Sequence, residues 1–532
     1  MSLLISRIIR RQRNGSLIEG YETRRAENCQ LVYEKTSPDE FCRSVGNIAS
    51  ALYHRLGIRK GDRVVILSEN RRQWLKFFLA VLDLGAIAVP LDVDILPERL
   101  QYILENSGAV AALCSAQGCF DRCEPLRKIK NLILLDSERT KNVVSGPTTY
   151  NFQQLIEFDL WEYPSEVEES DPALLIYTAG TSGEPKGILL SHQNLAANVE
   201  GIGNRINVGS SDNIAIILPL HHAFPLTVAL TALTYNASVT LASSHKRFSE
   251  IIRGTSPSII IAVPLMLEKM QRGIFKKIAE KGILFNLTFL SAYRLIGWIH
   301  RIFGFNLSHL IGSQIRASFP GLRCFVSGGA RLSPQLQVSL HHLDIPVING
   351  YGTSELSPVV SVQPFQEDLF YSSRYYLNHA GECGPLLHNL EGMVDQGGCL
   401  LVSGPSVMLG YFNDPGLDSR TIEIRNGRRW FNTSDVVEFR ADRSLMILGR
   451  CDNVIKLNCG KRVSAESIRE KIRLHPLFLD AWPYAAGGDS TQDSIRAAVL
   501  LNPDELSKLG LTEADPVEKF QRVGLEALKI IN

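Results

Sequence analysis

The sequence predicts an α/β protein in which a large N-terminal domain of doubly wound sheets plus a small β unit is followed by a small α+β C-terminal domain. Three observations lead to this fold class. Short apolar runs alternate with helical stretches over residues 62–114, and the same alternation returns over 173–263. After about residue 375 the pattern changes to short strands bounded by glycine. Strands that alternate with helices are typical of a parallel sheet covered by helices.

The first alternating region is typical of consecutive βα units. A β-branched run after a Gly-Asp turn predicts a buried strand, and an apolar stretch that ends at Gly85 predicts the helix after it. We expect three strands, at 62–67, 86–90 and 109–114, and two helices, at 77–84 and 99–106.

The second region and the β unit follow the same logic. Four further strands are expected, at 173–178, 214–218, 238–241 and 259–263, and two strands of the β unit at 398–404 and 444–449. The residues after Arg450 suffice for one small α+β module. We therefore predict one domain over 1–450 and a small mobile domain over 451–532.

Composition excludes several classes of protein. Of the 532 residues, 45% are hydrophobic and 21% are charged, which excludes disorder or a coiled coil for most of the chain. The net charge of +1 gives no reason to expect a nucleic-acid partner. No apolar run reaches the ~18 residues of a spanning helix, and no signal-peptide cleavage site follows the basic N-terminus. The ten cysteines form no regular framework, so we expect reduced thiols and a cytoplasmic protein.

The segment 272–316 differs from the rest of the chain. It is rich in aromatic residues and carries seven basic residues against one acid, Glu280. Arg294 and Arg301 are seven residues apart and share a helix face, while Tyr293 and Trp298 can enter a lipid headgroup layer. Two interpretations stay open: peripheral contact with an anionic membrane, or a pair of core helices with solvated charges.

The strongest local signal is the segment from Leu174 to Gly187. A buried strand ends at Tyr177 and leads into a loop of hydroxyl residues and glycines. Glycines let successive N–H groups turn toward one anion. Because Lys186 follows proline and precedes glycine, this is not the P-loop of NTPases. We expect the loop to bind phosphate through Thr178, Gly180, Thr181, Ser182, Gly183 and Lys186.

The loop YTAGTSGEPKG, followed by SHQN, resembles the phosphate loop of the adenylate-forming (AMP-binding) enzymes, which include the acyl-CoA synthetases. The likeness runs from about residue 30 to about 505 and recurs in order at five further motifs. The resemblance implies a catalytic role for Lys186. It also implies that Thr181 and Glu355 bind a Mg²⁺ ion that offsets the charge of ATP.

Three of the other motifs would surround the substrates. The segment FVSGGA resembles part of the family's adenine pocket, although an ordinary βα turn would look the same. The segment NGYGTSE resembles the GYGxTE motif, in which Tyr351 would lie flat against adenine and Glu355 would act in catalysis. His222 would line the acyl pocket with Gly328, although a hydrogen-bonded core histidine is the alternative. The implied nucleotide contacts are Gly328, Gly329, Ala330, Asn349, Gly350, Tyr351, Gly352, Thr353 and Ser354.

Two motifs near the C-terminus complete the set. WFNTSD resembles the TGD motif, and Asp435 would accept hydrogen bonds from both ribose hydroxyls. Ser434 stands where glycine is usual, which costs roughly 1 kcal/mol if the position needs a positive φ. The resemblance assigns Arg450 to the nucleotide and to catalysis, and makes Asp452 the hinge of a swinging small domain.

The family's last motif is a lysine in a C-terminal loop, and we do not find it before Asn532. Lys529 lies in a predicted helix over 517–532, so the chain is expected to be C-terminally shortened. The resemblance favours a long-chain fatty-acid–CoA ligase that uses ATP, Mg²⁺ and coenzyme A. Two alternatives stay open: an acyl carrier protein as acceptor, and a nucleotide- or acyl-binding homologue with weak or no ligase activity.

Overall fold

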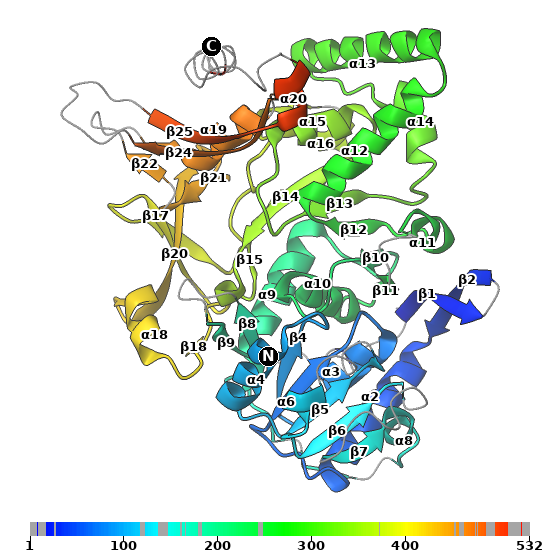
Figure 1. Ribbon diagram of the computed structural model, residues 1–532, viewed down its shortest axis with the longest axis vertical. Coiled ribbons are helices and arrows are strands. Elements are labelled where there is room, and N and C mark those ends of the chain that lie inside the picture. The colour runs from blue at the N-terminus through cyan, green and yellow to red at the C-terminus, as the bar shows by residue number, and fades with distance from the viewer. Residues whose placement is uncertain are drawn as a thin grey trace. The chain divides into compact units, whose positions relative to one another are not determined.

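The computed structural model arranges the chain around two large sheets and several smaller ones (Figure 1). It describes residues 8, 17–25, 28–116, 123–136, 147–159, 162–164, 166–178, 184–242, 248–371, 373–451, 454–456, 462–473, 475, 477–485, 495–508 and 523.

The first eight-stranded sheet has the order β18-β9-β8-β4-β3-β5-β6-β7. Its strands pair in parallel from β8 to β7, whereas β9 and β18 are antiparallel additions. The strands are β3 (Arg63–Leu67), β4 (Ile87–Leu91), β5 (Ala111–Cys114), β6 (Asn131–Leu134), β7 (Thr148–Asn151), β8 (Pro172–Thr178), β9 (Lys186–Ser191) and β18 (Gly410–Tyr411). The parallel sheet predicted for this region is confirmed.

The helices of this region pack apolar faces against the sheet. The helix predicted at 77–84 begins earlier, at Arg72, because Trp74 continues the buried face of the helix toward its N-terminus. The helices are α2 (Pro38–His54), α3 (Arg72–Asp83), α4 (Pro97–Ser107), α6 (Cys123–Leu126) and α8 (Phe152–Ile156).

The second eight-stranded sheet has the order β15-β14-β13-β12-β10-β11-β1-β2 and is parallel from β14 to β1. Its outermost strands, β15 and β2, are antiparallel. The strands are β1 (Leu17–Arg25), β2 (Asn28–Thr36), β10 (Asn213–Ile216), β11 (Ser238–Ala242), β12 (Ile259–Ala262), β13 (Cys324–Ser327), β14 (Val347–Gly352) and β15 (Val359–Val362).

The helices between residues 192 and 378 follow strands of both large sheets, and α9 follows β9 of the first one. Ser191 caps α9 by accepting a hydrogen bond from the Asn194 backbone N–H. The helical elements are α9 (His192–Ile206), α10 (Ala223–Thr234), α11 (Phe248–Thr255), α12 (Pro264–Ala279), α13 (Ile283–Phe303), α14 (His309–Arg316), α15 (Pro334–His342), η2 (Ser354–Leu356), α16 (Glu367–Tyr371) and α17 (Tyr375–Asn378).

The aromatic and basic segment forms α12, α13 and α14 (Figure 1). Neither of the two interpretations given above holds for all of it. Phe289 is buried in the core, and Tyr293, which was expected to reach a membrane, packs against that core and donates a hydrogen bond to Ser339. Trp298 on the same helix is 55% exposed. No helix among the described residues is both long and apolar enough to span a membrane.

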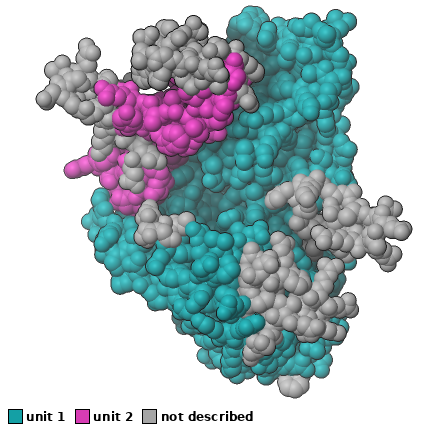
Figure 2. All heavy atoms as spheres, in the orientation of Figure 1, with its two compact units in different colours: residues 1–391, 402–431, 441–444 teal, residues 392–401, 432–440, 445–532 magenta. Residues whose placement is uncertain are grey.

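The described contacts divide the chain into two compact units (Figure 2). Unit 1 comprises 1–391, 402–431 and 441–444, and unit 2 comprises 392–401, 432–440 and 445–532. The domain boundary between residues 450 and 451 stays a prediction, because grouping by contacts does not test independent folding. The remaining elements are β16 (Glu391–Val394), β17 (Cys399–Ser403), α18 (Pro415–Thr421), β19 (Ile422–Arg425), β20 (Arg428–Phe439), β21 (Leu445–Arg450), β22 (Val454–Lys456), β23 (Arg462–Ser464), α19 (Ala465–Arg473), β24 (Phe478–Ala485), β25 (Ile495–Leu501) and α20 (Pro503–Lys508).

Unit 2 contains the predicted small strands and a core of its own. The strands expected at 398–404 and 444–449 are β17 and β21. Farther along the chain, α19 and the β24–β25 hairpin pack around Leu477 and Phe478, which gives the expected α+β module. The helix predicted over 517–532 lies outside the described residues apart from Val523.

Candidate active site

A cavity of about 470 Å³ lies in unit 1 at the carboxyl ends of β12, β13 and β14. Ligands in open α/β sheets bind at this edge, where loops after neighbouring strands converge. Nine residues that the sequence analysis assigned to substrates line it. They are Thr178, His222, Gly328, Gly329, Gly350, Tyr351, Gly352, Thr353 and Ser354.

Two buried hydroxyl groups of this cavity have no hydrogen-bond partner among the described residues. They belong to Thr178, which was predicted, and to Ser327, which was not, although it directly precedes the predicted Gly328. A buried polar atom without a partner is unfavourable by roughly 1–3 kcal/mol. A bound ligand that hydrogen-bonds here would remove that penalty.

Glycine is required at one position beside the cavity and gives a side chain room at a second. A Cβ atom on Gly352 would lie 2.0 Å from the carbonyl oxygen of Pro358, and one on Gly328 would lie 3.1 Å from the ring of Phe224. The first contact is with backbone and cannot relax. The GYG motif therefore brings Tyr351 to the cavity on a backbone that only glycine permits.

The rest of the cavity wall is apolar. Branched aliphatic side chains from α9, α10 and three strands form it, and they are Ile202, Ile206, Val228, Ile259, Ile261, Val326, Val359 and Val362. His222 lies at the N-terminus of α10, and its ring centroid lies 4.1 Å from that of His221. Loss of hydration lowers the pKa of both rings, and that of His221 falls to about 4. Both imidazoles are consequently neutral at pH 7, which suits an apolar pocket.

Glu355 is the centre of a buried polar cluster in unit 1. Its Oε1 atom accepts hydrogen bonds from Lys186 Nζ and Tyr411 Oη, each at 3.0 Å, and the Thr353 hydroxyl binds Oε2. Burial works to raise the pKa of Glu355, but the charge of Lys186 and the bond from Thr353 outweigh it and lower that pKa. Glu355 is therefore a carboxylate at pH 7.

Tyr411 is a member of this cluster that the sequence analysis missed. Its side chain is buried, Lys186 Nζ donates to its hydroxyl at 3.2 Å, and the same ammonium lies 4.7 Å from the ring centroid. Burial and the neighbouring Glu355 carboxylate raise the pKa of the Tyr411 hydroxyl, which remains protonated. Gly410 and Tyr411 pair with β9, which carries Lys186. The Gly-Tyr dipeptide alone gives no signal of this position.

Several predicted residues do not line the cavity. Ala330 is exposed beside it, and Asn349 is buried, where its amide nitrogen donates to the Glu382 carbonyl oxygen at 3.1 Å. Their nucleotide contacts stay predictions. Gly180, Thr181, Ser182, Gly183 and Asp452 lie outside the described residues.

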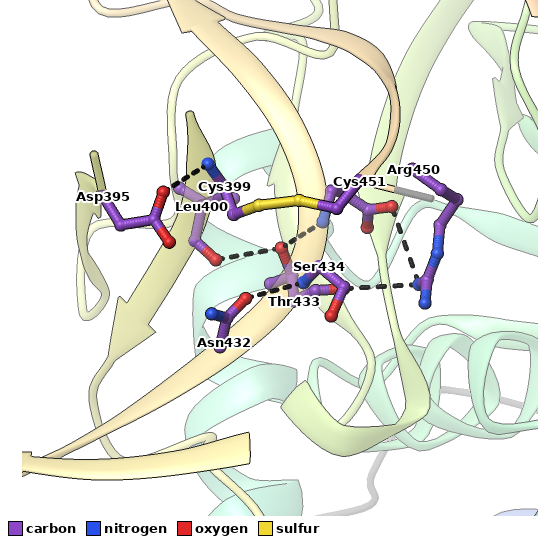
Figure 3. Close-up of a disulfide and its surroundings, with 9 residues drawn as sticks. Asp395, Cys399, Leu400, Asn432, Thr433, Ser434, Arg450 and Cys451 are labelled. Atoms are coloured by element: carbon purple, nitrogen blue, oxygen red, sulfur yellow. Dashed lines mark hydrogen bonds and ion pairs between the residues drawn. A yellow bond between two sulfur atoms is a disulfide. The ribbon is translucent and has the colours of Figure 1, made fainter. Parts of the chain in front are cut away.

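Unit 2 contains the other predicted carboxylate. Asp435 on β20 is the strand partner of Arg450 on β21, and Arg450 Nη1 lies 3.7 Å from Asp435 Oδ1 (Figure 3). The same nitrogen donates to the Thr433 carbonyl oxygen at 3.3 Å. The Arg450 side chain is 53% exposed, so this ion pair is well hydrated and weak.

The turn before Asp435 has the backbone that the sequence analysis considered. Ser434 has φ of 57°, in the left-handed region where glycine is favoured. Two hydrogen bonds hold this turn: the Asn432 side chain accepts from the Ser434 backbone N–H, and Thr433 Oγ1 accepts from that of Asp435. Local side-chain bonds therefore compensate for the absence of glycine.

A disulfide between Cys399 and Cys451 corrects the expectation of reduced thiols (Figure 3). The sequence gives no sign of this pair, because the two cysteines are 52 residues apart and form no recognisable motif. Cys42, Cys114, Cys324 and Cys383 form no disulfide with a described residue. The described residues contain no group of three or more His, Cys, Asp or Glu side chains that could hold a metal ion.

Comparison with known proteins gives the family. Residues 22–412 match the family described as AMP-binding enzyme. A long-chain-fatty-acid–CoA ligase, FadD15 of Mycobacterium bovis, is 26% identical over 476 residues, which cover 84% of this chain and 74% of that protein. Fatty acyl-CoA synthetase B of Dictyostelium discoideum is 27% identical over 484 residues, with coverages of 85% and 70%.

Solved structures agree with this assignment at the level of fold. ATP-bound MatB from Rhodopseudomonas palustris superimposes with a TM-score of 0.68 at 18% identity, covering 94% of this chain and 88% of that one. o-Succinylbenzoate CoA synthetase (MenE) from Bacillus subtilis, in complex with its acyl-adenylate, gives 0.66 at 19% identity, covering 96% and 92%. Because the family match covers most of its length, the chain belongs to the AMP-binding enzyme family and is an AMP-forming ligase.

Proposed function

We propose that this enzyme activates a long-chain fatty acid with ATP and transfers the acyl group to coenzyme A. The observation that carries the proposal is the cavity of unit 1, where nine predicted substrate residues meet a wall of branched aliphatic side chains. An apolar wall suits an alkyl chain, and the two unpaired hydroxyls of Thr178 and Ser327 suit a polar group at its end.

The reaction proceeds in two displacements. A carboxylate oxygen of the acid attacks the α-phosphorus of ATP, the bond to pyrophosphate breaks, and acyl-AMP forms. The thiolate of coenzyme A then attacks the acyl carbon and expels AMP, which gives the thioester. Acyl carrier protein is the alternative acceptor, because its phosphopantetheine thiol has the same chemistry.

Lys186 and Glu355 are placed to act in the first displacement. Lys186 supplies a positive charge where negative charge accumulates on phosphate, and Tyr411 with Glu355 fixes the position of its ammonium group. Tyr351 at the cavity supplies a flat ring for adenine. Asp435 in unit 2 supplies an acceptor for ribose hydroxyls.

Magnesium fits the donor set only in part. Glu355 is ionised and offers oxygen ligands, and Mg²⁺ in nucleotide sites commonly uses one or two carboxylates together with phosphates and water. When bound, the ion would neutralise phosphate charge. Lys186 already pairs with the same carboxylate, so Glu355 would divide its oxygens between the ammonium group and the ion.

We also propose peripheral contact with an anionic membrane through one face of α13. Leu284, Leu287, Leu295, Trp298 and Ile302 follow helical spacing and are 44–77% exposed. Arg294 and Arg301 on the same helix form no ion pair with any described residue. An exposed apolar face flanked by cations is typical of helices that lie in the membrane interface.

The experiment for the ligase is fatty-acid-dependent exchange of labelled pyrophosphate into ATP. We expect exchange with saturated acids of 12 to 18 carbons and little with acetate, since roughly 0.8 kcal/mol of affinity accompanies each buried methylene. Exchange that is equal for acetate and palmitate would contradict the substrate class. Complete absence of exchange, with ATP still bound, would favour the nucleotide-binding homologue.

The membrane contact is tested by co-sedimentation with vesicles of anionic phospholipid. The double variant Leu287→Asp, Trp298→Asp should stay in the supernatant. The control variant Lys128→Asp, which replaces a cation outside α13, should still sediment with the vesicles. Salt should weaken binding because exposed charges are screened. A wild-type protein that stays in the supernatant at low salt would remove this part of the proposal.

A further inference from the structure

A second and larger cavity lies outside the candidate active site. It is a groove of about 790 Å³ between α11, α12, α13 and α14, all within unit 1. Its walls are continuous helix faces. From α12 come Met270, Gly273, Ile274 and Ile278, and from α13 come Phe285 and Phe289. Residues spaced three and four apart share a helix face, so the groove follows the length of these helices.

The rim of the groove is cationic. Arg253, Lys269, Lys277 and Lys281 line it, and no described Asp or Glu does. None of the four forms an ion pair with a described residue, whereas Arg272 and Lys276 on the same helix pair with Glu268 and Glu280 outside the groove. Lys281 instead donates to the Gln314 side chain at 3.3 Å and lies over the ring of Phe285.

Gly273 indicates that the groove is kept open. It lies in the interior of α12, where glycine is unfavourable, and has an ordinary helical backbone. A Cβ atom added there would meet no atom within 4 Å. The absent side chain therefore serves neither backbone conformation nor close packing, and its effect is to leave space where the exposed Gly273 borders the groove.

We propose that this groove binds a single-chain anionic amphiphile, with the alkyl chain on the apolar floor and the anionic group at the lysine rim. A long-chain fatty acid is the occupant to which we commit. This choice rests on the proposed function, because the ligase would draw its substrate from the same class. The site is separate from the cavity beside Tyr351, with which it shares no lining residue.

The experiment is calorimetric titration of the whole protein with oleate, below its micellar concentration and without ATP. The wild type should bind two equivalents. In Gly273→Leu the leucine side chain should fill the groove without a clash, so this variant should bind one equivalent of oleate. Gly273→Ala, the control for side-chain size, should still bind two equivalents. Lys277→Gln should lower the affinity for the second equivalent of oleate about tenfold, which corresponds to the loss of one charge-assisted hydrogen bond. Lys276→Gln, the neighbouring cation outside the groove, should leave it unchanged.

Three results would overturn the groove as a site for a fatty acid. They are equal stoichiometry in the wild type and Gly273→Leu, equal effects of Lys276→Gln and Lys277→Gln, and undiminished affinity for oleylamine in place of oleate. Loss of vesicle binding in Gly273→Leu would identify a bilayer lipid as the occupant instead. Pyrophosphate exchange by Gly273→Leu reports on the ligase separately, so either proposal can fail alone.

The disulfide carries a second inference, independent of the groove. It ties Cys451, the residue directly after Arg450, to Cys399 on β17, which belongs to the same sheet as β21 (Figure 3). Arg450 is the strand partner of Asp435, so the bond is one residue beyond the predicted ribose site and one residue before the predicted hinge at Asp452. We infer that this disulfide is a redox-sensitive latch on the segment after Arg450.

The chemistry of the latch is thiol–disulfide exchange. A dithiol reductant supplies two electrons and two protons, its sulfurs join in a new disulfide, and Cys399 and Cys451 become free thiols. In the oxidised chain the disulfide and β21 both hold the segment that leads into the predicted hinge, whereas in the reduced chain β21 alone holds it. The inference rests on the proposed function in one respect: it assigns the swing of the small domain at the predicted hinge Asp452 to the step that forms the thioester.

Limited trypsin cleavage after Arg450 tests the latch without any assay of activity. Reduction with a dithiol should speed cleavage about tenfold in the wild type. The Cys399→Ser variant should be cleaved fast both with and without the reductant. The control variant Cys383→Ser, which removes a buried thiol outside the disulfide, should be cleaved at the wild-type rates. Equal cleavage rates in oxidised and reduced wild type would overturn the latch. The rate of acyl-AMP formation, measured beside it, reports on the ligase alone.

Discussion

The two predicted carboxylates lie in different surroundings. Glu355 in unit 1 is buried with three side-chain partners, among them Lys186 at 3.0 Å. Asp435 in unit 2 pairs with Arg450 over a longer distance, 3.7 Å, and the Arg450 side chain is exposed to solvent. The ion pair of Glu355 is therefore the tighter of the two. Glu355 orders a fixed charged cluster, and we propose that Asp435 acts on the nucleotide by binding its ribose.

The largest expected effect concerns Glu355. Glu355→Gln keeps the shape of the side chain but removes the charge that holds Lys186. Pyrophosphate exchange should fall by roughly 10²–10³, the usual loss for one preorganised electrostatic contact to a transition state. Full exchange at ordinary magnesium concentrations would show that the cluster serves structure alone.

Asp435→Ala should act on binding instead. Two hydrogen bonds from ribose hydroxyls to a charged acceptor would be lost, which corresponds to about 100-fold weaker ATP binding. Calorimetric titration with ATP measures it, and Asp442→Ala is the control, because that carboxylate pairs with His379 in unit 1. An unchanged affinity for ATP would remove Asp435 from the nucleotide site.

Tyr411→Phe should have a smaller effect than Glu355→Gln. The variant loses the hydroxyl that bonds to Glu355 but keeps the ring under the Lys186 ammonium. We expect the free energy of unfolding to fall by about 1 kcal/mol, and pyrophosphate exchange to fall by less than tenfold. A loss as large as that of Glu355→Gln would make Tyr411 a direct participant in catalysis.

The lowered pKa of Glu355 predicts a pH dependence of stability. The folded protein holds the carboxylate form, so this contribution is fully present above the ordinary glutamate pKa of about 4.3. It is lost as the pH falls through the lower pKa of the folded state. The difference in Tm between the wild type and Glu355→Gln should therefore shrink below about pH 4. A difference that stays constant from pH 7 to pH 3 would contradict the ionised cluster.

The smallest effect concerns the turn before Asp435. Ser434→Gly should raise the free energy of unfolding by up to ~1 kcal/mol, because glycine adopts the left-handed backbone without strain. The change should leave ATP affinity within a factor of two. A large rise in affinity would mean that the serine side chain itself obstructs the ribose site.

The sequence alone predicts most of the fold, for reasons that particular residues make clear. Runs such as Val64 to Leu67 allow only a buried strand, and the two alternating regions follow from many such runs. Within the site, the motifs around Thr178, Gly328 and Tyr351 identify a cavity because each lies at the carboxyl end of a strand, β8 in the first large sheet and β13 and β14 in the second.

Contacts between distant segments were beyond prediction. Tyr411 reaches Glu355 only because β18 pairs with β9, and a two-residue strand has no periodicity to detect. Cys399 and Cys451 meet because β17 and β21 both lie beside β20, which spacing along the chain does not reveal. Ser327 was overlooked because a serine at the end of a buried strand is common. Only the structure shows that its hydroxyl has no partner among the described residues.

The most direct test of the ligase is the fate of a carboxylate oxygen. Palmitate labelled with ¹⁸O in both oxygens is incubated with the enzyme, ATP and coenzyme A, and the products are analysed by mass spectrometry. Attack of the carboxylate on the α-phosphorus predicts one labelled oxygen in AMP, unlabelled pyrophosphate and a palmitoyl thioester that keeps one label. Unlabelled AMP, or ADP with labelled phosphate, would contradict the account.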